Sequence, residues 1–217
     1  MRSRRATWSR RTGLLLILAG VVLLGYVGWQ LYGTNYVSQR RHDSTVEALR
    51  EEWSRPGGTA SVNAGDSLSD AIMRVPAFGD AYAVPLVAGV EDEALASGMG
   101  VFPGSAAPGE EGNLALAGHR ITHGEPLREM PDLVAGDLVV IETRDRVFTY
   151  VLDTGGEELR VPFTAGWVLG NPPVNPDGGT GPAPGETRLL TLTTCAELFH
   201  TDDRLVAFGH LVDSRRR

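Results

Sequence analysis

Three side chains that together support acyl transfer each lie at the end of a predicted strand. Cys195, the only cysteine, ends the apolar run LLTLTTC; His119 ends LALAGH; and Arg204 opens RLVAFGHLV. A thiolate attacks a carbonyl carbon, an imidazole moves the proton, and a guanidinium stabilises the developing oxyanion. The three residue types therefore predict a cysteine nucleophile, its acid–base partner and an oxyanion-binding cation.

Taken singly, each of these residues also has a structural interpretation. One cysteine cannot form an intramolecular disulfide and is a poor metal site alone, but it can be buried core. His119 next to Arg120 could be a surface pair, and Arg204 follows two aspartates that could hold it in an exposed salt bridge. The residue types alone leave both interpretations open.

The N-terminal segment predicts a membrane anchor. Residues 1–12 hold five arginines and no acidic residue, and residues 13–33 are uncharged and mostly apolar, about the length that spans a bilayer. The positive-inside rule leaves the basic tail in the cytoplasm and the rest of the chain outside. A cleaved signal peptide is the alternative, but its apolar region is usually shorter and ends in small residues. We therefore expect a single-pass membrane protein with an extracellular domain.

The charge and composition disfavour nucleic acid and metal ions as partners. The net charge is −7, so nucleic acid is not expected as a partner. Acidic runs at 91–93 and 110–111 are typical of solvated surface, and no set of converging metal ligands emerges. We therefore expect no metal site and no cofactor.

The segment after the anchor divides at about residue 68. Residues 34–67 are predicted to form a juxtamembrane helix or stalk and a linker, because a polar, weakly helical stretch precedes one rich in Gly, Ser and Ala. Residues 68–214 are predicted to form the folded extracellular domain. Their short alternating segments between turns are typical of β-strands, and many strands with few helices favour a closed or nearly closed barrel.

Three segments of that domain carry more specific expectations. Short helices are predicted over 91–98 and 125–133. The loop over 171–186 is long and rich in Gly and Pro, so it is either a wall of the substrate site or a flexible insertion.

The motifs in combination resemble the sortase family of membrane-anchored cysteine transpeptidases. The family's T-L-x-T-C strand end matches residues 191–195, its upstream histidine matches His119 within AGHR, and its downstream arginine matches Arg204. The resemblance covers 71–212 and implies a closed eight-stranded sortase-type β-barrel with a few short helices. The N-terminal anchor and the GHRITHGEPL segment are similar to class E housekeeping sortases of high-GC Gram-positive bacteria.

The resemblance also implies a reaction. Cys195 would cleave an LAxTG- or LPxTG-like sorting signal between Thr and Gly, and the thioester would pass to an amine of a peptidoglycan precursor. His119 would protonate the departing amine, Arg204 would hold the oxyanion or the substrate backbone, and Thr193 and Thr194 would line the substrate site. The implied partners are secreted proteins with a C-terminal sorting signal and the cell-wall precursor.

Other assignments remain possible at this point. His123 and His200 could compete with His119 for the acid–base role, although His119 fits the family position, and His210 is expected to be structural. The main alternative function is a non-catalytic anchored β-domain that binds sorting signals or envelope polymers. An envelope L,D-transpeptidase is disfavoured because TLTTC lacks the Ser and Gly that precede that family's cysteine.

Overall fold

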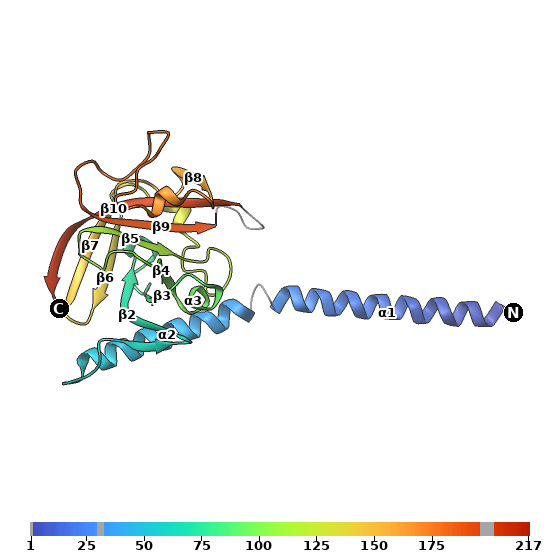
Figure 1. Cartoon of the computed structure of the whole chain (residues 1–217). Helices are drawn as coiled ribbons and strands as arrows, with labels where there is room; N and C mark the ends of the chain where they lie inside the picture. Colours follow the sequence, from blue (N-terminus) through green and yellow to red (C-terminus); the bar gives the residue numbers. More distant parts are fainter. Residues whose placement is uncertain (1, 30–32, 196–201) are drawn as a thin grey trace.

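A closed β-barrel is the centre of the folded domain in the part of the chain that the computed structural model describes, residues 2–29, 33–195 and 202–217 (Figure 1). Its strands are β2 (Ser67–Arg74), β3 (Val84–Ala88), β4 (Met99–Val101), β5 (Gly112–Ala117), β6 (Leu138–Thr143), β7 (Arg146–Leu152), β9 (Arg188–Cys195) and β10 (Asp203–Arg216). They pair in the order β2-β3-β4-β5-β9-β10-β7-β6, and β6 pairs back onto β2. Within the described residues, the predicted closed eight-stranded barrel is confirmed.

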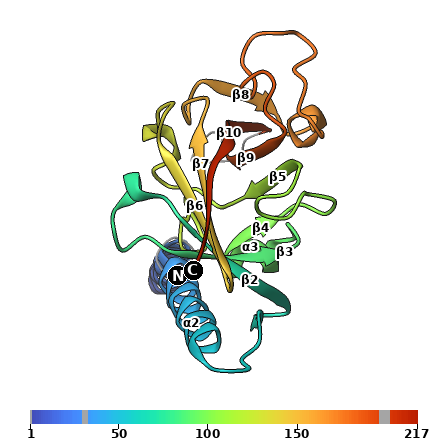
Figure 2. The ribbon, with the colours of Figure 1, turned by 90° about the vertical axis from the view of Figure 1, so that its left-hand side faces the viewer.

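The remaining elements surround this barrel. β1 (Val62–Ala64) pairs with β2, and β8 (Leu159–Pro162) pairs with the start of β10. The helices are α1 (Arg2–Gly28), α2 (Thr34–Ser54) and α3 (Asp92–Ser97), with 3-10 turns η2 (Pro76–Phe78), η3 (Met130–Asp132) and η4 (Gly166–Leu169). Figure 2 shows α2 and β8 on opposite sides of the barrel.

The two faces of β9 are both covered, which explains its apolar and threonine-rich sequence. Leu190 and Leu192 belong to the barrel core, because alternate side chains of a strand point to the same face. The opposite face carries Thr191, Thr193 and Cys195, and the β8–η4 segment covers it. This second face is where the predicted nucleophile lies.

The element predictions for this domain differ in their outcome. The helix expected over 91–98 is confirmed as α3, whereas most of the helix expected over 125–133 is wrong. Only η3 forms there, since Pro126 and Pro131 lack backbone donors and Glu125 has a φ of 52°. The short strands β4 and β8 carry no alternating pattern in sequence and were not predicted.

The helix after α1 lies against the barrel. Val46 and Leu49 of α2 pack with Ile72 of β2, and Leu49 has no exposed surface. Burying a leucine side chain contributes about 1.5–3 kcal/mol. The segment expected as a stalk and linker therefore includes a helix and a strand, β1, that pack onto the predicted extracellular domain.

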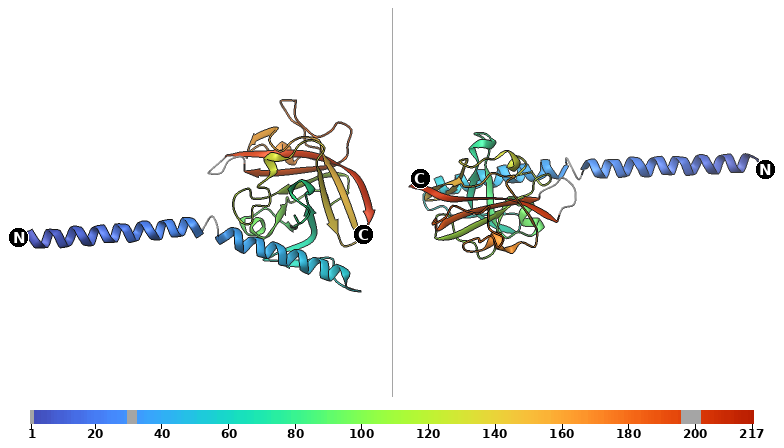
Figure 3. Two further views of the ribbon diagram at one scale, coloured as in Figure 1. Left: turned by 180° about the vertical axis from the view of Figure 1, so that it is seen from behind. Right: turned by 90° about the horizontal axis from the view of Figure 1, so that it is seen from above.

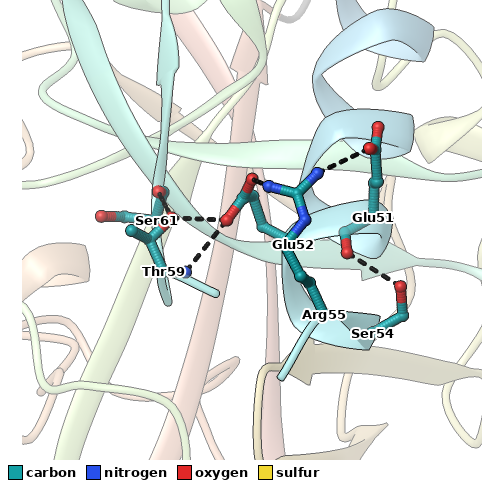
Figure 4. A network of polar contacts seen from close by, with 6 residues as sticks. All are labelled: Glu51, Glu52, Ser54, Arg55, Thr59 and Ser61. Carbon is teal, nitrogen blue, oxygen red and sulfur yellow. Dashed lines mark hydrogen bonds and ion pairs between the residues drawn. The ribbon is translucent and has the colours of Figure 1, made fainter. Parts of the chain in front are cut away.

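A polar network reverses the chain between α2 and β1 (Figure 4). The Glu52 carboxylate accepts hydrogen bonds from Arg55 Nη1 at 2.5 Å and from the Thr59 amide at 3.1 Å. The Thr59 hydroxyl donates to the Ser61 carbonyl at 2.8 Å. These contacts end α2 and direct the chain into β1.

The first helix is long and apolar enough to cross a membrane. Its window Arg11–Gly28 has a mean hydropathy of 1.9, and none of it is buried against the rest of the chain. Two views show α1 extending away from the barrel (Figures 1 and 3). Length and composition therefore fit a membrane-spanning segment.

Candidate active site

The nucleophile candidate and the cation candidate lie on neighbouring strands. Cys195 is the last residue of β9 and is paired directly with Arg204 at the start of β10. Residues directly opposite each other in an antiparallel pair project from the same face, with Cβ atoms about 4.5–5.5 Å apart. The strand register therefore puts the thiol and the guanidinium on one face of the barrel wall.

The histidine candidate reaches the same place from β5, the other neighbour of β9. β5 runs parallel to β9 with Ala117 opposite Thr193. Beyond this pair, the Gly118 amide donates to the Thr193 carbonyl at 3.1 Å, and the Thr194 hydroxyl donates to the Gly118 carbonyl at 2.7 Å. Both backbone groups of Gly118 are thus fixed by β9, which positions His119 beside the Cys195 end of the sheet.

One cavity of about 440 Å³ contains all the predicted site residues on its walls. Its polar lining includes Cys195, His119, Arg204, Thr193 and Thr194, together with Asp92. Its apolar lining comes from α3 and its flanks and from the β8–η4 segment, and includes Val90, Leu95, Phe102, Val161, Phe163, Val168 and Leu169. The walls from residues 161–169 were not predicted from the sequence, because the pairing of β8 with β10 brings that segment to the site.

The long loop over 171–186 is not part of this lining among the described residues. The loop is held instead just after the end of β7, where the Ala183 amide donates to the Asp153 carboxylate at 3.0 Å. The wall that the sequence suggested for this loop is formed by residues 161–169.

The environment of His119 keeps its imidazole neutral near pH 7. Burial, with a smaller contribution from the nearby His123, lowers the pKa of His119 to about 4, while Asp92 acts in the opposite direction. The two imidazole rings lie 4.7 Å apart between centroids. His119 Nε2 is buried and has no hydrogen-bond partner among the described residues. A neutral imidazole with an unused ring nitrogen is able to accept a proton.

The threonines before the cysteine differ in what they offer a ligand. Thr194 is 3% exposed, and its hydroxyl is already engaged with the Gly118 carbonyl. Thr193 is 6% exposed and lies on the same strand face as Cys195. Of the two residues predicted to bind substrate, Thr194 therefore has a structural contact of its own.

The other histidines have separate environments. His123 packs against the His119 ring, and it does not line the cavity among the described residues. His210, on β10, has its Nδ1 atom 2.6 Å from Asp153 Oδ1 and does not line the cavity. His200 lies outside the described residues.

Comparison with known proteins finds relatives that all belong to one family. The sortase domain family model matches residues 73–212. Sortase SrtE1 of Streptomyces coelicolor is 30% identical over 221 residues, covering 96% of this chain and 58% of that protein. This chain therefore spans less than two thirds of that relative's length.

Solved structures show the same fold. The structure of sortase E from Streptomyces avermitilis matches with a TM-score of 0.59 and 33% identity, over 68% of this chain and 90% of that chain. The structure of sortase E1 from Streptomyces coelicolor with a tripeptide in its active site matches with a TM-score of 0.55 and 28% identity, over 68% and 90%. By sequence motif, family model and barrel topology, this chain belongs to the sortase family and resembles its class E members.

Proposed function

We propose that this chain is a membrane-anchored cysteine transpeptidase that transfers sorted proteins to the cell wall. Its substrate is an LAxTG- or LPxTG-like signal, cleaved between Thr and Gly, and its acceptor is an amine of a peptidoglycan precursor. The observation that carries the proposal is the meeting of Cys195, His119 and Arg204, from three adjacent strands, on the walls of one cavity in a sortase-family chain.

The first half-reaction forms a thioester. As the Cys195 sulfur attacks the threonine carbonyl, its proton passes to the neutral His119 imidazole, and a C–S bond forms. The tetrahedral intermediate then collapses, the C–N bond breaks, and the His119 imidazolium gives the proton to the departing glycine amine. In the second half-reaction the acceptor amine attacks the thioester and His119 takes its proton. The C–S bond then breaks, and the leaving Cys195 sulfur receives that proton from the His119 imidazolium.

Arg204 stabilises the oxyanion of both tetrahedral intermediates. Its place opposite Cys195 in the strand register brings a permanent positive charge to the nucleophile's side of the sheet. Preorganised donors of this kind contribute about 2.7–4 kcal/mol of transition-state stabilisation.

The shape and chemistry of the cavity fit a peptide. Its walls are largely apolar, with Val161 and Leu95 among them, and the polar groups gather at Cys195. Such a site holds an aliphatic side chain beside a scissile amide. The tripeptide in the active site of the related sortase E1 supports a peptide ligand for this cavity.

The anchor places the enzyme at its substrates. We infer that α1 spans the membrane with its arginine-rich start in the cytoplasm and the barrel outside. Sorting signals and lipid-linked cell-wall precursors would then reach the cavity at the outer membrane surface.

A transpeptidation assay tests the function. The full-length chain in detergent micelles is mixed with a fluorogenic LAxTG peptide and a triglycine amine, and products are identified by mass spectrometry. The proposal expects peptide–triglycine product from the wild-type chain and none from Cys195→Ala. With no added amine, water would resolve the thioester slowly and give the hydrolysed peptide. Peptide binding without product from the wild-type chain would support the non-catalytic binding domain instead.

A further inference from the structure

The buried face of α2 changes character along the helix. Its C-terminal half is apolar and packs on the barrel through Val46, Leu49 and Trp53. Its N-terminal half is polar yet covered, with Ser38 and His42 each 4% exposed. Polar groups are buried when they make specific contacts, so this half of α2 has partners of a different kind. One partner is α3, where Arg41 donates to the Ser97 hydroxyl and His42 bonds the Ala96 backbone. The other is the segment of residues 119–127, which we call the His119 loop.

A single amide holds both arms of the His119 loop. Asn35 Nδ2 donates to Glu125 Oε1 at 2.5 Å and, at a long 3.5 Å, to the Ile121 carbonyl. Asn35 Oδ1 accepts a hydrogen bond from the Gly124 amide at 3.1 Å. At the base of the loop, the Leu127 amide donates to the His119 carbonyl at 3.0 Å. Asn35 therefore connects α2 to a loop whose first residue is the proposed acid–base group.

The tip of the loop has a conformation that needs outside support. His123, Gly124 and Glu125 have φ values of 52°, 84° and 52°. Left-handed backbone costs about 1–2 kcal/mol for each residue that has a side chain. Such a tip persists when its surroundings hold it. α2 is the element that does so, through Asn35.

His42 packs directly on this tip. A Cβ at Gly124 would lie 2.7 Å from His42 Cε1 and 3.4 Å from the Gln39 amide nitrogen, so the loop backbone lies directly against α2. His42 Nε2 is buried and has no hydrogen-bond partner among the described residues. A third imidazole is thus buried behind the loop that carries His119 and His123.

We propose that α2 is a positioning element of the active site, in which Asn35 and His42 hold the His119 loop and thereby orient the His119 ring toward Cys195. The inference rests on the proposed function, because it assigns α2 a part in the work of His119. It also links the proposed membrane-spanning helix to the active site, because α2 begins six residues after α1 ends. The helix that follows the membrane span then orients the acid–base residue, His119.

The first test separates positioning from folding. Asn35→Ala and the matched control Asn63→Ala, an exposed position on β1, are compared in the full-length chain in micelles. We expect Asn35→Ala to lower kcat at least about tenfold with KM within twofold, since small misplacements of a catalytic group cost up to about 100-fold. Asn63→Ala should match the wild type. A kcat for Asn35→Ala within twofold of wild type would overturn the proposal.

A paired exchange gives a rescue that a general loss of stability does not produce. Asn35→Asp alone places a second carboxylate beside that of Glu125, and the repulsion should lower kcat as Asn35→Ala does. Adding Glu125→Gln restores a donor–acceptor pair with the amide and the acid exchanged. We expect the double variant to recover at least about fivefold in kcat over Asn35→Asp. A double variant no faster than Asn35→Asp would contradict the clamp, even if Asn35→Ala proves unstable.

Hydrogen exchange distinguishes failure of this inference from failure of the proposed function. The Leu127 amide, bonded to the His119 carbonyl, should exchange faster in Asn35→Ala and at the wild-type rate in Asn63→Ala. This readout requires no activity. A wild-type chain without transpeptidation would refute the proposed function, whereas unchanged exchange in Asn35→Ala would refute the role of α2.

Discussion

Cys195 and Arg204 face each other across neighbouring antiparallel strands, one at the end of β9 and the other at the start of β10. The pair shares the outer face of the barrel wall with Thr193 and Val206, under the β8–η4 segment. The thiol and the guanidinium therefore keep their relative position through a rigid sheet. A catalytic pair held on strands is placed more accurately than one held on loops.

Arg204→Lys should lose most of the activity although it retains the charge. A lysine ammonium lacks the planar, multiply donating guanidinium and hydrates more strongly. We expect kcat to fall about 100- to 1,000-fold with a small change in KM. The measurement is steady-state transpeptidation, with Arg215→Lys at the exposed far end of β10 as the matched control. Equal losses for the two variants would argue against an oxyanion role for Arg204.

Thr194→Val should impair the site without touching the thiol. The valine is close in shape but removes the hydroxyl that donates to the Gly118 carbonyl at 2.7 Å. An unpaired buried carbonyl costs about 1–3 kcal/mol, and we expect that loss in the free energy of unfolding. Because Gly118 precedes His119, kcat should fall as well. Thr149→Val on β7, whose hydroxyl makes no described side-chain hydrogen bond, should leave both quantities near wild type.

Leu49→Ala should weaken folding more than catalysis. Leu49 is fully buried between α2 and the barrel, so the substitution leaves a cavity and should cost about 2–5 kcal/mol by denaturant unfolding. Leu68→Ala, at a side chain that is 56% exposed, is the matched control and should cost far less. If both cost the same, α2 does not pack on the barrel as described.

Acid should destabilise the fold through its buried histidines. Burial lowers the pKa of His42 to about 4, from about 6.5 in the unfolded chain. The unfolded state then binds more protons between these two values. The stabilisation is therefore complete above about pH 6.5 and is lost as the pH falls toward 4. For His42 the loss is on the order of 3 kcal/mol.

The variant His42→Gln isolates that contribution. Its free energy of unfolding should change less between pH 7 and pH 4 than that of the wild type, whatever its absolute stability. The comparison of slopes, measured by urea unfolding at each pH, removes any general effect of the substitution. An unchanged slope would show that His42 is not buried in its neutral form.

The sequence predicted the barrel class and a long apolar N-terminal helix well, for physical reasons. Alternation marks β6 and β7, and an uninterrupted apolar segment marks α1. The proximity of Cys195 and Arg204 also follows from sequence, because a short connection joins two neighbouring strands. These features depend on local patterns.

The other half of the site depends on pairing between distant segments. His119 reaches Cys195 only because β5 pairs in parallel with β9, and no local pattern contains that information. The resemblance to a family supplied it in advance. The contact of α2 with the His119 loop was missed because its buried face is polar there, so no apolar stripe marked it.

Trapping the acyl-enzyme tests the central claim most directly. The full-length wild-type chain is mixed with an LAxTG peptide without acceptor amine, quenched in acid within seconds, and analysed by intact-mass and peptide mass spectrometry. We predict an added mass equal to the peptide through its threonine, located on Cys195, released by hydroxylamine and missing in Cys195→Ala. Cleavage of the peptide with no adduct on Cys195, or an equal adduct in Cys195→Ala, would contradict the account.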